Sequence, residues 1–361
     1  MRLQRLTLRS FRNLADASLV VPHAGAVLLG ANGQGKTSLL EAIGYPVLFR
    51  SFRTAIDGEL VRFGEPGFHV ELGFLKGDRT HEVATTFRTV GRRKQLQVDG
   101  VPSTRLVDVA GTWLAVTFAP EDVRLASGPA QTRRLFLDRT LALSDPAYLT
   151  ALARYRAALA QRNSALRQGR PDLAGAFDAP LAQAGAVVVA RRTAWVRLMA
   201  ERLAGLVRAL GESSAEAALA YQGHGDLADP GAWAARLAEA APRDAGRRMT
   251  TVGPHRDDLE LRLGGRSLRD YGSTGQQRSA AIALKLLELE TIERATGRCP
   301  VLLLDDVFAE LDQERQGRLA ALLFTGRAAQ TFISAPRADE LPPGLDLPLW
   351  RVAGGGVTAT D

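Results

Sequence analysis

A chain of 361 residues is long enough for two domains, or for one large domain with an insertion. Its 46% apolar and 24% charged residues are typical of a soluble globular protein, and no run of about 20 apolar residues could span a membrane. The single cysteine, Cys299, excludes an internal disulfide, and the first residues lack the apolar core of a signal peptide, so we expect a cytoplasmic protein with no membrane partner. The net charge of +7 fits a polyanionic partner, although a modest positive charge is common without one.

The N-terminal third is rich in strand patterns. Short alternating or apolar segments, separated by turns that contain glycine, lie at residues 3–8, 17–21, 26–29, 68–75, 81–88, 94–98 and 113–118. These patterns predict a β-rich region that surrounds the segment 26–37.

A phosphate-binding loop is predicted directly after the strand at 26–29. It consists of Gly30, Ala31, Asn32, Gly33, Gln34, Gly35, Lys36 and Thr37. The glycines let backbone N–H groups surround phosphate oxygens, and the helix that begins near Gly35 directs its positive end at the same charge. We expect Lys36 at the β- and γ-phosphates and the Thr37 hydroxyl on Mg²⁺. A chance match is disfavoured, because only four of the 46 basic residues are lysines.

The middle of the chain has a helical pattern. From about residue 121 to 241, Ala, Leu and Arg recur at helical spacing, with helices predicted near 145–168 and 177–210. A helix of at most about 35 residues is roughly 50 Å long, which suffices for a compact lobe but not for a long coiled coil.

Strand patterns return after about residue 250. A strand at 258–263, a long helix after Ser273, a strand at 301–305, a helix near 313–323 and a strand at 330–334 are predicted. The order predicts an α/β fold, in which a P-loop ATPase core with a mixed sheet is interrupted by an inserted helical lobe. We assign residues 1–118 and 297–361 to the ATP-binding lobe, and residues 119–296 to the helical lobe.

Two adjacent carboxylates end the apolar strand at 301–305. Ligands of open α/β sheets bind at the carboxyl ends of the strands, so we expect Asp305 to hold Mg²⁺ together with Thr37. Asp306 is expected nearer to the attacking water, as the catalytic residue. An isolated Asp-Asp pair would be read as a solvated turn or a helix cap, but the phosphate loop in the same chain favours the functional interpretation.

A further anion-binding helix end is predicted at Ser273-Thr-Gly-Gln-Gln277. A hydroxyl, a glycine and free N–H groups lie at the start of a helix. An ordinary N-cap would explain the segment in isolation. Its position shortly before the carboxylate strand favours a role in nucleotide binding.

With these motifs, the chain resembles the ABC-type ATPases of the SMC-like group and, within it, the RecF recombination-repair proteins. The resemblance rests on the motifs above and on four more segments that occur in the RecF order: 11–14, 50–53, 120–138 and 253–258. In that group a Ser-X-Gly-Gln signature of one subunit closes over ATP on the phosphate loop of the other. The resemblance implies this role in trans for Ser273, Gly275 and Gln276.

The resemblance also implies roles at the edges of the site. Glu310 and Asp312 match the loop at the dimer seam, and Arg12 and Asn13 are candidates for contacts with the base or ribose. Two positions depart from the usual pattern: Asp306 stands where ABC ATPases place Glu, and Ser334 stands where they place His. Because the shorter carboxylate would hold the attacking water less well, we expect a weak, DNA-stimulated ATPase that acts as a timing switch.

Binding to DNA is implied by the resemblance. It predicts sequence-independent contacts at gaps or at junctions of single and double strands, an ATP-induced homodimer, and the partner proteins RecO and RecR, which help to load the recombinase in homologous recombination and the SOS response. Arginines that could contact phosphates are Arg50, Arg53, Arg133, Arg134, Arg191, Arg192, Arg247 and Arg248. For any one of them, a solvated helix face is the alternative.

Two other functions share the phosphate loop. The ATP-binding subunit of a membrane transporter would carry the signature as Leu-Ser-Gly-Gly-Gln, and a P-loop phosphotransferase would work as a monomer with lid arginines near a substrate pocket. The signature form and the arginine pairs favour the DNA-repair hypothesis.

Overall fold

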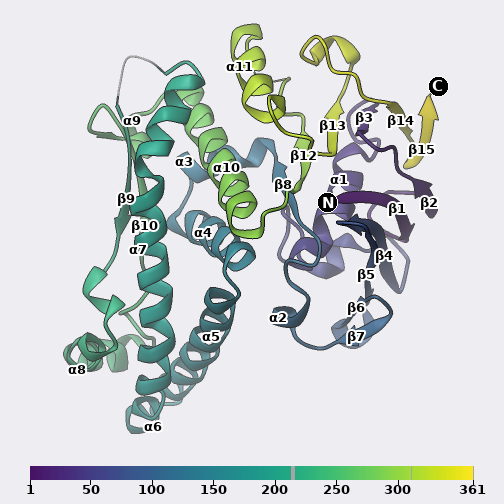
Figure 1. Cartoon of the computed structure of the whole chain (residues 1–361). Coiled ribbons are helices and arrows are strands. Elements are labelled where there is room, and N and C mark those ends of the chain that lie inside the picture. Colours follow the sequence, from purple (N-terminus) through teal and green to yellow (C-terminus); the bar gives the residue numbers. More distant parts are fainter. Residues whose placement is uncertain (213–215, 310, 361) are drawn as a thin grey trace. The chain divides into compact units, whose positions relative to one another are not determined.

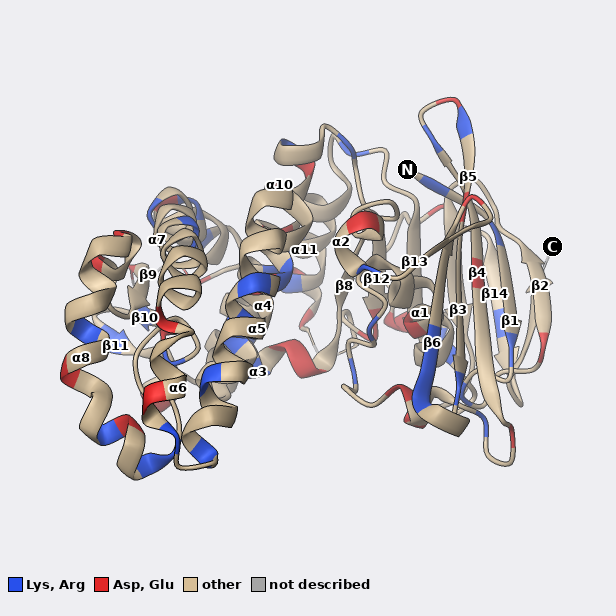
Figure 2. Cartoon of the chain, turned by 90° about the horizontal axis from the view of Figure 1, so that it is seen from below, with Lys and Arg blue, Asp and Glu red and all other residues tan. Residues whose placement is uncertain are grey.

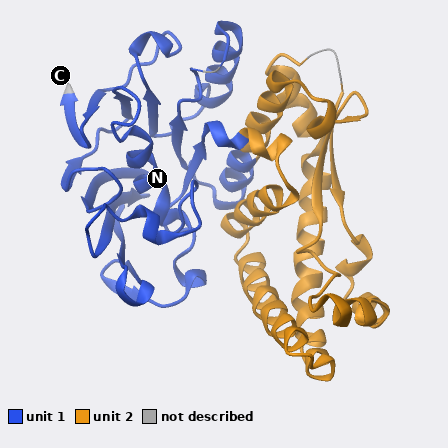
Figure 3. Cartoon of the chain, turned by 180° about the vertical axis from the view of Figure 1, so that it is seen from behind, with its two compact units in different colours: residues 1–122, 288–361 blue, residues 123–287 orange. Residues whose placement is uncertain are grey.

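The computed structural model describes residues 1–212, 216–309 and 311–360 (Figure 1). The chain forms two compact units, one made of residues 1–122 and 288–361 and the other of residues 123–287 (Figure 3). The predicted boundaries lay after residues 118 and 296. The structure divides after residues 122 and 287 instead, and the second division falls inside one continuous helix, α10 (Thr274–Thr296).

The first unit contains two six-stranded sheets. One is antiparallel, in the order β2 (Ala17–Val20), β1 (Arg2–Arg9), β4 (Gly67–Lys76), β5 (Arg79–Arg88), β6 (Arg93–Val98) and β7 (Val101–Ser103). The other is mixed, in the order β15 (Gly356–Thr360), β14 (Leu349–Ala353), β3 (Gly25–Leu29), β13 (Thr331–Ala335), β12 (Val301–Asp305) and β8 (Ala115–Phe118). In the mixed sheet only β15 runs antiparallel to its neighbour.

This mixed sheet brings the two ends of the chain together. Strand β13 pairs in parallel with β3 on one side and with β12 on the other, so both predicted halves of the nucleotide site end at the same sheet edge. The strands β3 and β12 are apolar and almost fully buried, as expected for parallel strands covered on both faces. The helices and single turns of this unit are α1 (Lys36–Gly44), η1 (Tyr45–Val47), η2 (Asp57–Leu60), η3 (Val90–Arg92), α2 (Leu106–Val109), α11 (Gln313–Phe324) and η6 (Ala338–Glu340).

A buried glutamine joins the two sheets. The side chain of Gln330 accepts from the Leu3 N–H at 2.6 Å and donates to the Leu3 and Pro22 carbonyls, both at 2.9 Å. Gln330 directly precedes β13 of the mixed sheet. Its side chain therefore satisfies the N–H and carbonyl of Leu3 in the antiparallel sheet and the carbonyl of Pro22, which follows β2.

The second unit is mainly helical. Its elements are α3 (Arg124–Ser127), α4 (Ala130–Ser144), α5 (Pro146–Arg167), α6 (Pro171–Gly175), α7 (Asp178–Ala209), η5 (Gly225–Ala228), α8 (Pro230–Arg247), α9 (Leu268–Tyr271) and the first part of α10; the turn η4 (Pro120–Val123) leads into it. Helix α5 begins as its sequence predicts, with Pro146 in its first turn and the Asp145 carboxylate accepting from the Ala147 N–H at 2.9 Å.

One part of the helical prediction was wrong. Residues 217–222 form strand β9 (Ala217–Gln222), which pairs antiparallel with β10 (Asp258–Leu263) in a three-stranded sheet completed by β11 (Arg266–Ser267). The sequence Ala-Ala-Leu-Ala has a strong helix propensity, but six residues of pairing with β10 outweigh it. The confirmed features are the α/β class, the ATPase-type core and the inserted, mainly helical unit.

Candidate nucleotide site

The predicted phosphate loop links β3 to α1. Gly33 and Gly35 have φ values of 80° and 115°, in the left-handed region that favours glycine. A Cβ on Gly35 would also lie 2.9 Å from the Leu14 side chain. The Lys36 ammonium is buried inside the loop, where it donates to the carbonyls of Gly30 at 2.6 Å and Ala31 at 3.2 Å.

The carboxylates at the end of β12 meet this loop. The Thr37 hydroxyl donates to Asp305 Oδ1 at 2.9 Å, although 268 residues separate the two positions. The Ser334 hydroxyl lies 2.8 Å from the same Asp305 oxygen and 3.0 Å from Asp306 Oδ1. Its single proton can be donated to only one carboxylate at a time, while its oxygen accepts from the Asp306 N–H at 2.9 Å.

Burial has a strong effect on Asp305. Loss of solvent, with a smaller contribution from the neighbouring charges of Asp306 and Glu121, raises the pKa of its carboxyl to about 6, against the lowering effect of the Ser334 and Thr37 hydroxyls. A buried carboxylate whose charge is poorly compensated by the protein is suited to a cation ligand. The effect of Glu121 on this pKa also shows that Glu121 lies near the site.

The backbone at Asp306 is unusual. Its φ of 48° is in the left-handed region, which costs energy for a residue with a Cβ. The bonds from Ser334 to its N–H and its carboxylate hold it there. Sequence reasoning treated Ser334 only as a missing histidine; the structure shows it as the group that orients both carboxylates.

Arg12 and Asn13 both lie beside the loop. Arg12 donates to both oxygens of the Glu41 carboxylate, each at 2.9 Å, and to the Glu59 carbonyl at 2.9 Å. Asn13 donates to the Gly33 carbonyl at 3.0 Å. Glu41 is fully buried in α1 and was not predicted as a site residue; a lone acid on an apolar helix face was the available signal.

A pocket of about 1080 Å³ lies beside the phosphate loop. Its lining includes the phosphate loop at Gly35, Lys36 and Thr37, the neighbouring Arg12 and Asn13, and, from the following loop, Ile56, Gly58, Glu59 and residues 61–65. Arg53 and Asp306 also line it. This volume can hold a nucleoside triphosphate.

The signature segment begins helix α10. Gln276 N–H donates to the Ser273 hydroxyl at 3.2 Å, and Ser273 N–H donates to the Gln276 side-chain oxygen at 3.0 Å. This reciprocal pair is a capping box, which fixes the first turn of the helix. It therefore holds Ser273 and Gln276 on either side of Gly275.

The predicted dimer-seam loop is described in part. Asp312 caps helix α11 by accepting from the Arg315 N–H at 2.9 Å. Glu310 lies outside the described residues.

Two arginines predicted as DNA contacts are corrected by the structure. Arg133 is buried and bonds both oxygens of Asp258 at 2.7 Å, and Arg192 is buried and bonds Asp138 at 2.7 Å and the Pro254 carbonyl at 2.7 Å. Their guanidinium groups are enclosed by their own unit, so they cannot reach a DNA backbone without unfolding it.

The other candidate arginines differ in exposure. Arg134 is half-buried and donates to the Asp257 carbonyl at 2.7 Å, and Arg53 is paired with Glu41 at 3.6 Å. Arg191 is 56% exposed and paired with Asp145 at 3.0 Å. Arg50, Arg247 and Arg248 are exposed. Basic residues are spread over helices and strands of both units (Figure 2).

The motif at 253–258 is the centre of the buried polar network. Pro254, Asp257 and Asp258 of this motif accept the bonds from Arg192, Arg134 and Arg133 described above. In the same motif, His255 Nδ1 lies 2.6 Å from the Tyr155 hydroxyl, and its Nε2 lies 3.0 Å from the Thr250 carbonyl. Burial lowers the pKa of His255 to about 4, so the ring is neutral at pH 7. The motif is structural in this unit.

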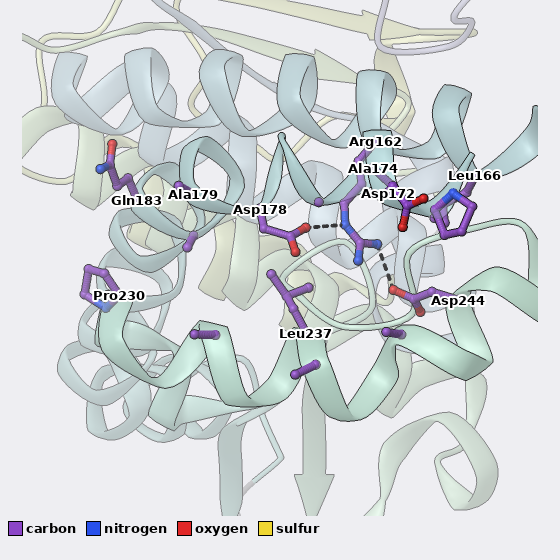
Figure 4. Close-up of a pocket in the computed structure, with 16 residues that line it drawn as sticks. Arg162, Leu166, Asp172, Ala174, Asp178, Ala179, Gln183, Pro230, Leu237 and Asp244 are labelled. Atoms are coloured by element: carbon purple, nitrogen blue, oxygen red, sulfur yellow. Dashed lines mark hydrogen bonds and ion pairs between the residues drawn. The ribbon is translucent and has the colours of Figure 1, made fainter. Parts of the chain in front are cut away.

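A second pocket, of about 730 Å³, lies in the same unit among α5, α6, α7 and α8. Figure 4 shows Arg162 between Asp178 and Asp244, with 2.7 Å bonds to each. Arg162 also donates to Thr250 at 2.8 Å. The ion pairs join three helices in a pocket whose lining is otherwise mainly apolar, with Asp172 and Gln183 as its other polar residues.

Among the described residues, no helix has both the length and the apolar character needed to cross a membrane.

Comparisons with known proteins agree with this geometry. Residues 2–342 match the family model described as RecF/RecN/SMC N terminal domain. A protein from Anaeromyxobacter sp. (strain Fw109-5) named "DNA replication and repair protein RecF" is 40% identical over 375 residues, covering 99% of both chains. The protein of the same name from Geobacter sulfurreducens is 37% identical over 366 residues, covering 99% of this chain and all of the relative.

Solved structures give the same result. The structure of "the recombination mediator protein RecF-ATP in RecFOR pathway" has a TM-score of 0.90 at 29% identity and covers 100% of this chain and 98% of that chain. An Smc head bound to the C-winged helix domain of ScpA has a TM-score of 0.59 at 15% identity, covering 100% and 97%, and shares the fold. With its phosphate loop, its carboxylate strand and its full-length relatives in agreement, the chain belongs to the RecF family of DNA replication and repair proteins.

Proposed function

We propose that this protein is a cytoplasmic, ATP-dependent DNA-binding protein of recombinational repair and replication-gap processing. The observation that carries the proposal is the meeting of Thr37, Asp305 and Ser334, which joins the phosphate loop to the carboxylate strand across the whole chain. The relatives' names and the ATP complex of a RecF protein support it.

Mg·ATP is the ligand that this donor set fits. The buried Lys36 ammonium and the loop N–H groups would bind the phosphates, and Thr37 and Asp305 would hold Mg²⁺. A bound Mg²⁺ supplies charge neutralisation for the phosphates. The raised pKa of Asp305 supports the assignment, because a cation would replace the solvent that burial removes.

Hydrolysis would be slow. Asp306 would position the attacking water with a carboxylate one methylene shorter than the usual Glu, and its backbone is already fixed by Ser334. Ser334 offers only a hydroxyl and cannot provide the cationic ring of a histidine. A slow ATPase stimulated by DNA fits a timing switch better than a motor.

The complete site would need two copies of the chain. Ser273, Gly275 and Gln276 of one copy would close over the γ-phosphate bound by the other, with Asp312 near the seam. The capping box supports this role, because it keeps the start of α10 ordered, with Ser273 exposed. ATP would then hold the dimer together, and hydrolysis would release it.

DNA would be bound through its backbone. The exposed Arg50, Arg247 and Arg248 are the best placed of the candidate arginines, with Arg191 next. Gapped DNA and junctions of single and double strands are the expected substrates, and RecO and RecR the expected partners, by the family relationship.

The test is the oligomeric state. Sedimentation with and without Mg·ATP, each with and without gapped duplex DNA, should show monomers without nucleotide and dimers with it, and DNA should be retained mainly with the dimer. If the protein stayed monomeric both with and without Mg·ATP and still hydrolysed ATP at its full rate, the proposal would be contradicted.

A further inference from the structure

The nucleotide pocket has one end whose side chains are not explained by phosphate or metal binding. Its lining at residues 56–65 includes Ile56 and Phe63. Both are exposed: Ile56 at 57% and Phe63 at 104%, the largest value among the exposed apolar side chains of the described residues. An aromatic ring held in water at the edge of a ligand pocket is unfavourable unless something covers it.

The charges of the pocket set the direction of a bound nucleotide. Lys36 and the loop glycines line one part of the pocket, and Asn13 and Arg12 connect this part to the segment 56–65, because Asn13 bonds the Gly33 carbonyl and Arg12 bonds the Glu59 carbonyl. The lining at 56–65 carries two acids, Glu59 and Glu65, and one arginine, Arg62, whose charge is paired with Asp16 at 2.7 Å. A triphosphate is repelled by these acids, so its phosphates must lie at the Lys36 end and its base at the end that contains Phe63.

Phe63 is at the tip of an ordered turn. The Glu65 N–H donates to the Arg62 carbonyl at 3.1 Å, and Gly64 between them has a φ of 85°. A positive φ at the third residue is typical of a type II turn, which places Phe63 at the second position with its side chain outside the turn.

Both sides of this turn are tied to the body of the unit. Arg62 N–H donates to the Ser10 carbonyl at 2.8 Å, and its guanidinium bonds Asp16 at 2.7 Å. On the other side, the Pro66 carbonyl accepts from the N–H and the hydroxyl of Thr89, at 2.9 and 2.7 Å. The ring is therefore presented at a fixed place, which lowers the entropy lost when a ligand covers it.

We propose that Phe63 stacks on the nucleobase of the bound nucleotide, with Ile56 as a second apolar contact. The inference rests on the proposed ATP-binding function and assigns the base end of that site. Stacking on an aromatic ring favours any nucleobase over none, and it explains why the chain leaves a phenylalanine in water beside a polar pocket.

The test compares ATP with tripolyphosphate, which has the phosphates but neither ribose nor base. Phe63→Ala should weaken ATP binding about tenfold, the loss expected for one base–aromatic stack, and leave tripolyphosphate binding unchanged. Val20→Ala is the matched control, because Val20 is an 85% exposed apolar residue of the same unit outside the pocket lining. It should bind both ligands as the unsubstituted protein does.

A second variant gives a direct signal. Phe63→Trp should keep the ATP affinity, and its added fluorescence, relative to the unsubstituted protein, should be quenched by ATP but not by tripolyphosphate. Unchanged ATP affinity in Phe63→Ala, or an equal loss for both ligands, would overturn the assignment of the base end. Failure of the unsubstituted protein to bind either ligand would instead reject the proposed function.

Discussion

Arginine has opposite roles in the two units. In the unit that contains the phosphate loop, Arg12 and Arg53 line an open pocket and share one buried acid, Glu41. In the mainly helical unit, Arg133, Arg162 and Arg192 are buried and bonded to aspartates of the same unit. The comparison teaches that an arginine-rich helical region need not be a DNA surface: part of its charge holds the helices together.

Adjacent arginines in a helix illustrate the difference. Successive residues of an α-helix point about 100° apart. In α7, Arg192 therefore faces the interior while Arg191 is 56% exposed. An arginine pair on a packed helix such as α7 therefore need not supply two phosphate contacts.

The largest expected effect tests this contrast. Arg192→Met should lower the free energy of unfolding by about 3–5 kcal/mol, because it leaves the buried Asp138 without its main partner. Arg191→Met, its neighbour, should cost roughly 1 kcal/mol or less, as exposed ion pairs do. Urea unfolding of both variants measures the difference. Equal stabilities, with a loss of DNA affinity only in Arg192→Met, would restore Arg192 as a DNA contact.

The counterpart in the first unit should affect chemistry and not stability. Lys36→Arg should retain part of the nucleotide affinity but lower the hydrolysis rate on the order of 100-fold, since a planar guanidinium cannot occupy the place of the ammonium in the loop. Steady-state ATPase assays, with unfolding curves as the control, measure both quantities. Turnover at the unsubstituted rate would reject the phosphate-loop assignment.

A pH-dependent effect is expected from the buried network. The unfolded chain protonates His255 near pH 6.5, but the folded chain does so only near pH 4. The unfolded state therefore binds the extra proton between these values, so the free energy of unfolding falls as the pH drops from 6.5 to 4 and is unaffected by this group above 6.5.

His255→Gln isolates that contribution. Between pH 7.5 and pH 5 the variant should lose about 2 kcal/mol less stability than the unsubstituted protein. Urea unfolding at the two pH values is the measurement. Parallel losses in the two proteins would show that His255 is solvated in the folded state.

The smallest expected effect concerns Ser334. Ser334→Ala removes the hydroxyl that lies within hydrogen-bonding distance of both carboxylates, and it leaves the Asp306 N–H without this acceptor. We expect a stability loss of about 1 kcal/mol and a roughly tenfold lower kcat. Ser334→Thr, which keeps the hydroxyl, is the control. If the alanine variant hydrolysed ATP normally, the positioning role of Ser334 would be wrong.

The fold was largely predictable because its signals are local. The phosphate loop, the apolar strand before Asp305 and the helices at 146–167 and 178–209 each follow from spacing and composition. Strand β9 was not predictable, because its residues prefer a helix and only the distant β10 makes them a strand.

The site was predictable only in part, for a related reason. The roles of Lys36, Thr37 and Asp305 could be predicted because each is a characteristic residue type at a fixed place in a short local motif. The bond between Ser334 and the carboxylates depends on strand order, since Ser334 lies opposite Asp305 in the pairing of β12 and β13. The burial of Arg133 and Arg192 depends on which helix face packs inward, and two adjacent arginines in a sequence do not indicate that face.

The central claim is that each nucleotide is closed by a second copy of the chain, and a mixing experiment tests it most directly. Lys36→Arg and Ser273→Arg should each be inactive alone. In an equimolar mixture, half of the dimers should be heterodimers, each with one site made of an unsubstituted Lys36 and an unsubstituted Ser273. The account predicts recovery of about a quarter of the unsubstituted ATPase rate. A mixture that forms heterodimers with ATP but remains as inactive as its two components would contradict it.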